Sequence, residues 1–174
     1  MKKKNNTKRL TVCAMMAAVG VVILYLGSFV EVLDISVAVA ASLIATVIVI
    51  EYGAPSAFSV YGVTAILSLL LVPQKFPAAA YAFFFGYYPI VKQKIERMQS
   101  RALQWVIKSL VFLAATAATV VFLSLFTPDA PVGILMVIFA LLALVTLFIY
   151  DLALTRVISF YVWRLRNRVK NIFK

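Results

Sequence analysis

Few residues of this sequence could carry chemistry, and they are not grouped in known catalytic patterns. The 174 residues include six acids, one cysteine (Cys13) and no histidine. Cys13 therefore cannot form an intrachain disulfide, and a zinc site, which takes three or four Cys, His or carboxylate ligands, is not expected. The H-E-x-x-H, G-x-S-x-G and G-x-x-x-x-G-K-[ST] motifs are absent from the sequence. We expect no catalytic residue, no metal and no cofactor, so any ATP-driven motor must belong to another chain.

Polar residues at one end of several apolar segments form the candidate ligand site. If the segments cross a membrane in alternating directions, these residues converge on its outer face. Small-ligand sites are commonly pockets with a few converging polar groups, although short outer loops must be polar in any case. The candidate ligand-binding residues are Tyr25, Glu31, Asp34, Lys75, Tyr81 and Asp129.

Two further acids, Glu51 and Asp151, lie near the opposite, cytoplasmic ends of their segments. A charge inside the membrane is costly unless it is paired or reaches the interface. We expect Asp151 either to form a structural ion pair with Lys108 or Arg156, or to reach the membrane interface by snorkelling.

The elements that must position these residues are strongly apolar. Hydrophobic residues make up 64% of the chain and charged residues 13%, whereas a soluble domain has about 45–50% and about 25%. Mean hydropathy is +1.03. The 17 basic residues cluster at the ends of apolar segments, a pattern that suits anionic lipid headgroups and not nucleic acid. The composition predicts an all-α, polytopic integral membrane protein whose partner is the lipid bilayer.

Turn and proline signals divide the chain into three parts. A basic cytosolic leader covers 1–9, a six-helix transmembrane domain covers 10–154, and a basic amphipathic tail covers 155–174. The tail suits either an inner-surface helix or a solvated segment. The fourth apolar segment is short and rich in aromatic residues. The expected spans are 10–30, 35–52, 55–72, 76–91, 105–126 and 132–154.

The charge distribution predicts the orientation of these spans. With six crossings, every basic residue except Lys75 falls on one side, as the positive-inside rule requires of the cytoplasmic side. Omitting the fourth span would place a basic cluster outside. We therefore expect a multi-pass protein of the cell membrane with both termini in the cytoplasm.

The first apolar segment carries small residues at helical spacing. Ala14 and Ala18 are four apart, with Ala17 and Gly20 beside them, a pattern that allows close helix packing within the bundle or against a partner. Together with the size, the six segments and the stretch 11–18, this makes the chain resemble the substrate-binding S components of bacterial energy-coupling factor (ECF) vitamin transporters. The resemblance implies that Ala14 and Ala18 dock a coupling subunit, that two ATPase subunits complete the complex, and that a small molecule binds at an outward-opening site.

Three functions are compatible with the sequence. The first is a substrate-binding membrane subunit, not itself an enzyme, for uptake of a vitamin or similar nutrient. The second is a non-transporting membrane scaffold, because rod-shape-determining membrane proteins share the size and layout. The third is a lipid-handling membrane enzyme, which would require acids clustered around a cavity.

Overall fold

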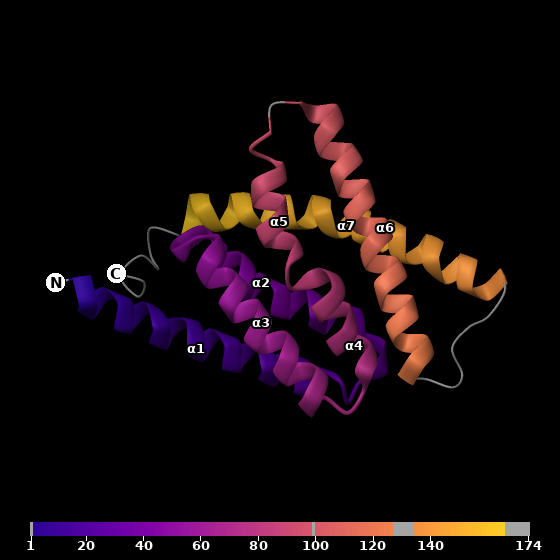
Figure 1. The fold of residues 1–174 in the computed structure, drawn as a ribbon, viewed down its shortest axis with the longest axis horizontal. Helices are drawn as coiled ribbons and strands as arrows, with labels where there is room; N and C mark the ends of the chain where they lie inside the picture. Colours follow the sequence, from indigo (N-terminus) through magenta and orange to yellow (C-terminus); the bar gives the residue numbers. More distant parts are fainter. Residues whose placement is uncertain (1, 99, 127–133, 166–174) are drawn as a thin grey trace.

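The computed structural model describes residues 2–98, 100–126 and 134–165, and its regular elements there are all helical (Figure 1). This confirms the predicted all-α class. Three short elements, η1 (Glu31–Leu33), η2 (Tyr81–Phe85) and η3 (Tyr161–Leu165), join or extend the main helices. The main helices are α1 (Lys2–Gly27), α2 (Asp34–Tyr52), α3 (Ala54–Leu71), α4 (Lys75–Ala80), α5 (Tyr88–Ile95), α6 (Arg101–Phe126) and α7 (Ile134–Phe160).

Five of the described helical segments are long and apolar enough to cross a membrane, which indicates a membrane protein. The basic leader is part of α1, which is helical from Lys2 onward. Beyond 154, where the tail was expected to begin, α7 continues to Phe160. The candidate spans are Thr7–Gly27, Asp34–Tyr52, Ala54–Leu71, Arg101–Phe122 and Ala140–Arg164. The predicted fourth span, 76–91, is not among them because it is divided into shorter helices.

This divided segment, α4–η2–α5, lies in the middle of the molecule. The side chains of Ala78, Ala79, Tyr88 and Ile90 are fully buried, and the segment packs against α2, α3 and α6. A helix that other helices cover on all sides is apolar around its whole circumference. Its burial explains why this segment can be short and irregular, since neighbouring protein can satisfy the backbone groups that the irregularity releases.

The irregular backbone of η2 is hydrogen-bonded by a side chain of α3. The backbone N–H of Gly86 donates to the carbonyl of Tyr81 (2.8 Å). This bond spans five residues, as in a π-helix, whereas the bonds of an α-helix span four. The Tyr61 hydroxyl donates to the carbonyl of Ala82 (2.7 Å). A Cβ on Gly86 would lie 2.6 Å from the Tyr61 ring. Glycine at position 86 therefore lets α3 approach closely enough for Tyr61 to bond the η2 backbone.

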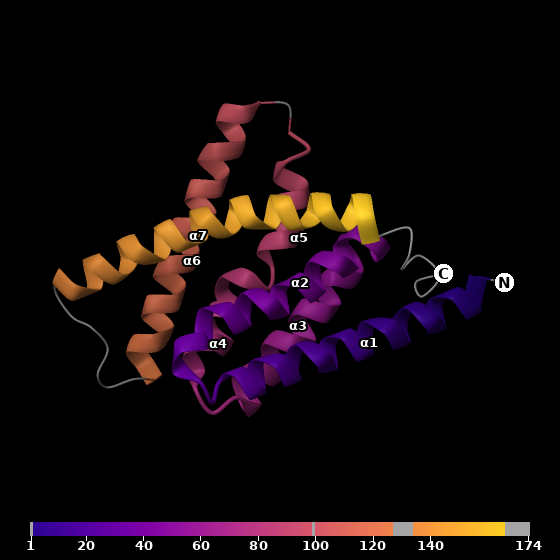
Figure 2. The same ribbon diagram turned by 180° about the vertical axis from the view of Figure 1, so that it is seen from behind.

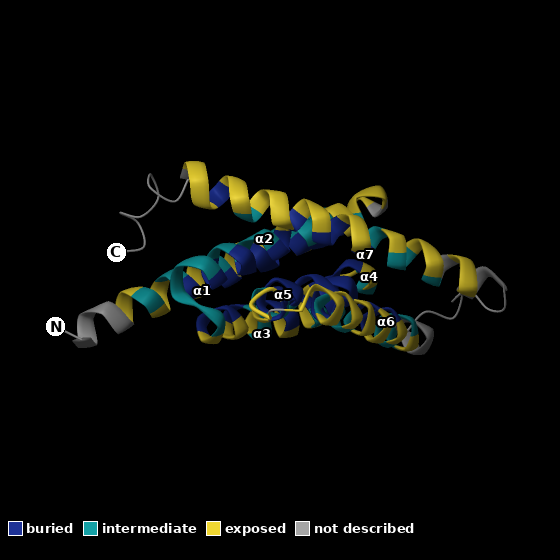
Figure 3. Ribbon diagram, turned by 90° about the horizontal axis from the view of Figure 1, so that it is seen from above, coloured by how far each residue is buried: buried dark blue, intermediate teal, exposed yellow. Residues whose placement is uncertain are grey.

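The remaining helices surround this centre. α1, α2 and α3 pack closely against one another, and α7 crosses the molecule on the far side in the view of Figure 1, as the reverse view of Figure 2 shows. α7 is tied to α2 by a hydrogen bond between the hydroxyls of Tyr150 and Ser42 (2.8 Å). Buried residues gather along α2 and α5, while α6 and α7 are exposed on their outer sides (Figure 3). Those apolar outer sides are suited to contact with lipid.

The bundle has two distinct ends. At the first, which we call the Lys75 end, α1 and α3 finish and α2 and α4 begin (Figure 1). At the second, the Lys92 end, α2 finishes, α3 begins and α5 connects to α6. Arg9 of α1 donates to the Ser56 hydroxyl (2.6 Å) and to the carbonyl of Tyr52 (3.2 Å). The start of α1 is thereby held beside the turn between α2 and α3 at the Lys92 end.

Candidate functional site

A buried ionic cluster lies at the Lys92 end, where α5, α6 and α7 meet. Tyr88, Lys92 and Glu96 follow one another at intervals of four residues from α5 onward, a spacing that places them on one helix face. That face is contacted by Lys108 from α6 and by Asp151 from α7. Five polar residues from three parts of the chain therefore come together at one end of a bundle whose core is mainly apolar.

Asp151 is the centre of the cluster. Its Oδ1 accepts hydrogen bonds from the Tyr88 hydroxyl (2.5 Å) and from Lys92. Its Oδ2 accepts from Lys108 Nζ (2.9 Å), and Lys92 Nζ also donates to its backbone carbonyl (3.1 Å). The expected pairing of Asp151 with Lys108 is confirmed. Lys92 is an additional partner that we did not predict, whereas Arg156 is exposed.

Glu96 extends the cluster toward the surface. Its Oε1 lies 2.9 Å from Lys92 Nζ and 3.3 Å from Lys108 Nζ. The Glu96 side chain is 40% exposed, while those of Lys92 and Asp151 are 1% and 4% exposed. Two ammonium groups thus face two carboxylates, and the cluster is neutral overall. Such balance is necessary because a buried charge without a partner is strongly destabilising.

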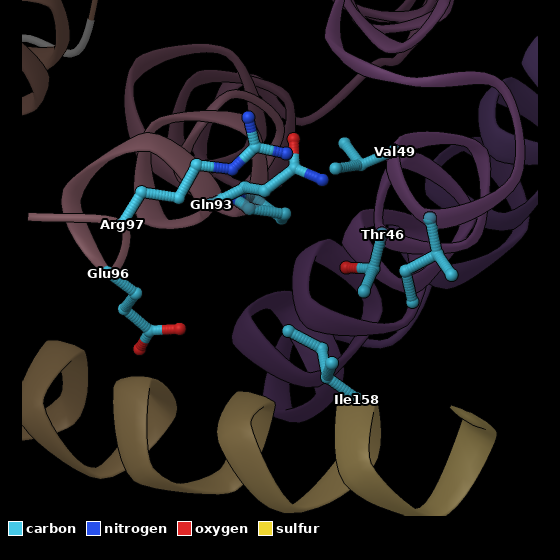
Figure 4. A pocket seen from close by; sticks show the side chains of 8 residues that line it. Thr46, Val49, Gln93, Glu96, Arg97 and Ile158 are labelled. Carbon is cyan, nitrogen blue, oxygen red and sulfur yellow. The ribbon is translucent and has the colours of Figure 1, made fainter. Parts of the chain in front are cut away.

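A cavity of about 230 Å³ opens next to this cluster. Its walls come from the last turns of α2, from α5 and the residues after it, and from α7 (Figure 4). The Thr46 hydroxyl points toward the cavity from α2, across from Gln93, Glu96 and Arg97 (Figure 4). The complete lining is Thr46, Val49, Ile50, Pro89, Gln93, Glu96, Arg97 and Ile158. Apolar side chains form half of the lining, and the polar ones lie mainly on the side of α5.

The predicted ligand residues lie mostly at the Lys75 end, away from this cavity. Lys75 Nζ donates to the carbonyls of Leu69 and Val72 (both 3.0 Å), so the ammonium group caps the end of α3. The exposed Tyr25 ring packs edge-on against Phe29, with centroids 5.5 Å apart. These side chains are directed to local partners and do not converge on one point.

The other predicted ligand residues are more dispersed. Tyr81 is buried in η2, with its ring 6.2 Å from that of Tyr61. Asp34 is half-buried in the first turn of α2, where a carboxylate interacts favourably with the helix dipole. Glu31 begins η1, and Asp129 lies outside the described residues. A joint ligand site for these residues stays a prediction.

The predicted docking residues Ala14 and Ala18 are both on the exposed side of α1. Ala17 is instead buried, and Gly20 faces Thr64 of α3, whose Cγ2 would lie 3.1 Å from an added Cβ. One row of small residues thus packs within the bundle, and the neighbouring row is left available. The internal packing that was an alternative for this motif applies to Ala17 and Gly20.

Lys92 and Tyr88 were not among the predicted site residues. The fourth span was predicted to end at 91, one residue before Lys92, whereas α5 continues to Ile95. The available signal was the four-residue spacing of Tyr88, Lys92 and Glu96, together with the single acid Asp151 in a long apolar segment. A lysine in such a row, next to an apolar segment, needs a carboxylate from another helix as its partner.

Comparisons with protein-family models, with curated proteins and with solved structures found no match.

Proposed function

We propose that this chain is a substrate-binding membrane subunit for uptake of a small nutrient, driven by ATPase subunits on other chains. The observation that carries the proposal is the free face of α1. Ala14 and Ala18 are exposed while the opposite side of the helix packs against α2 and α3. An exposed pair of small residues at four-residue spacing lets a second helix approach closely in a membrane, as docking to a coupling subunit requires.

The charge distribution supports the orientation that this function needs. Arg9, Lys92, Arg97 and Lys108 all belong to the Lys92 end, and basic residues favour the cytoplasmic side. In the six-span topology the Lys75 end then faces outward, and Tyr25, Glu31 and Asp34 lie near the outer surface. A nutrient would enter from that side. The segment α4–η2–α5 serves as the fourth of the six crossings, shielded from lipid by its neighbours.

A membrane scaffold is the second candidate. It is favoured by Lys75, whose ammonium group is used to cap α3 and does not line a cavity that the structure describes. A scaffold would bind a protein partner through the same free face of α1 but no small molecule.

The test is affinity purification in mild detergent, followed by mass spectrometry of bound proteins and bound small molecules. A transport subunit should retain ATPase and coupling subunits, and Ala14→Trp or Ala18→Trp should release them. Ala117→Trp is the matched control, because Ala117 is an exposed alanine on α6. Recovery of neither a small molecule nor an ATPase, together with no uptake defect on deletion, would contradict the proposal. A stable non-ATPase partner would support the scaffold instead.

A further inference from the structure

The cavity at the Lys92 end has two chemically different sides. Val49, Ile50, Pro89 and Ile158 supply an apolar wall. The Thr46 hydroxyl donates to the carbonyl of Ser42 (3.0 Å), so it has no further proton to donate to a ligand. The hydrogen-bond donors that remain are therefore those of Gln93 and Arg97 on the opposite side. A ligand that matches both sides has an acceptor group joined to an apolar part.

The charge of the cavity favours an anion. Glu96 is the acid in the lining, and its carboxylate already faces the ammonium groups of Lys92 and Lys108. Arg97 is exposed and has no ion pair among the described residues. Counting the adjacent cluster with the cavity, three cations stand against two carboxylates. The excess positive charge belongs to Arg97, a planar group that can hold two oxygens of one phosphate.

The position of the cavity relative to the membrane indicates where the ligand comes from. Trp105 and Trp163 are exposed at this end, 45% and 89% respectively, and tryptophan is enriched at the level of lipid headgroups. Lys108 Nζ lies 5.5 Å from the Trp105 ring centroid, so the ionic cluster is near the same level. At about 230 Å³ the cavity is smaller than the roughly 300–1,000 Å³ of a typical small-molecule pocket. That volume suits one headgroup more than a complete nutrient.

We propose that this cavity binds the phosphate headgroup of an anionic phospholipid. Arg97 and Gln93 hold the phosphate oxygens, and the apolar wall of α2 and α7 receives the first part of the lipid chains. The lipid would join α2, α5 and α7 where the bundle meets the interface. This inference concerns the opposite end from the predicted nutrient site and does not depend on whether the chain transports.

The test measures retained lipid by native mass spectrometry of the purified full chain, in detergent supplemented with phosphatidylglycerol or phosphatidylcholine. We expect selective retention of phosphatidylglycerol. Arg97→Gln should reduce it about tenfold, the size of effect for loss of a charge-assisted hydrogen bond. Arg101→Gln is the matched control: it removes the same charge four residues further along, at the start of α6, but Arg101 does not line the cavity. It should change retention less than twofold.

A second pair of variants tests the apolar wall. Ile50→Trp fills the cavity and should abolish selective retention, whereas Val47→Trp, on the same helix outside the lining, should preserve it. Equal losses for Arg97→Gln and Arg101→Gln would overturn the proposal in favour of general surface attraction. Displacement of phosphatidylglycerol by an equal concentration of glycerol 3-phosphate would overturn the lipid assignment and identify a site for a soluble phosphate ester. Failure of Ile50→Trp to fold would leave the Arg97 comparison decisive.

Discussion

The two ends of this bundle use their polar residues differently. At the Lys92 end, side chains from α5, α6 and α7 bond one another across long sequence separations, with Asp151 at the centre. At the Lys75 end, Lys75 bonds carbonyls only three and six residues away, and Ser28 bonds the carbonyl of Tyr25. The first end holds three helices together, while the second satisfies local helix ends.

This difference shows which polar residues the fold depends on. A group that caps its own turn can be lost with little effect on neighbouring helices. A charge that is paired across helices leaves a buried partner behind when it is removed. Substitutions of the same chemical type at the two ends should therefore have unequal effects. Asp151 against Asp34 and Lys92 against Lys75 test this directly, and Gly86 tests the centre between the two ends.

Asp151→Asn should have the largest effect. It leaves Lys92 and Lys108 with Glu96 as their remaining acid, and breaking a buried ion pair costs about 3–5 kcal/mol. Asp34→Asn, the same change at the Lys75 end, removes a favourable helix-dipole interaction of about 0.3–1 kcal/mol. Denaturant unfolding in detergent micelles would measure both free energies. Equal losses would show that the cluster does not hold α7 in place.

Lys92→Met should rank second, at about 2–3 kcal/mol, because Asp151 keeps Lys108 and Tyr88 while Glu96 loses one of its two cations. Lys94→Met is the control, since Lys94 is exposed two residues further along the same helix. The same unfolding assay applies. A Lys94 variant as unstable as the Lys92 variant would contradict the buried position of Lys92.

Gly86→Ala tests the centre that separates the two ends. The added Cβ would meet the Tyr61 ring at 2.6 Å, and such overpacking costs about 1–3 kcal/mol. Gly62→Ala on α3 has open space around the new Cβ and should stabilise by about 0.5–1 kcal/mol, because alanine favours a helix. Thermal unfolding of the two variants should shift in opposite directions. If both unfolding temperatures shifted in the same direction, the close approach of Tyr61 to Gly86 would not be required for the stability of η2.

Lys75→Met should have the smallest effect on stability, about 0.3–1 kcal/mol from the lost cap of α3. It also separates the two possible roles of this residue. A small stability loss with unchanged retention of any co-purifying molecule indicates a cap alone. Loss of that molecule at unchanged stability would support a place for Lys75 in the proposed nutrient site.

Much of this architecture follows from patterns within short stretches of the chain. The helical class and five long apolar segments follow from composition and from turn signals such as Gly53 and Pro73, because both are local properties. The partnership of Asp151 with Lys108 was also predictable, since a lone acid in an apolar segment must find a cation. The candidate residues at the Lys75 end were chosen from their position in the chain, which does not determine where each side chain points.

The fourth apolar segment marks the limit of such reasoning. Residues 76–91 are recognisably apolar, aromatic and short from their composition alone. Contacts between distant parts of the chain establish three further features: the helix continues to Ile95, Tyr61 bonds the irregular turn, and Lys92 is buried against Asp151. The reason is physical: a lysine at the end of an apolar segment is stable either in water or beside a buried carboxylate. Which of the two it meets depends on a helix about sixty residues further along the chain, brought there by packing.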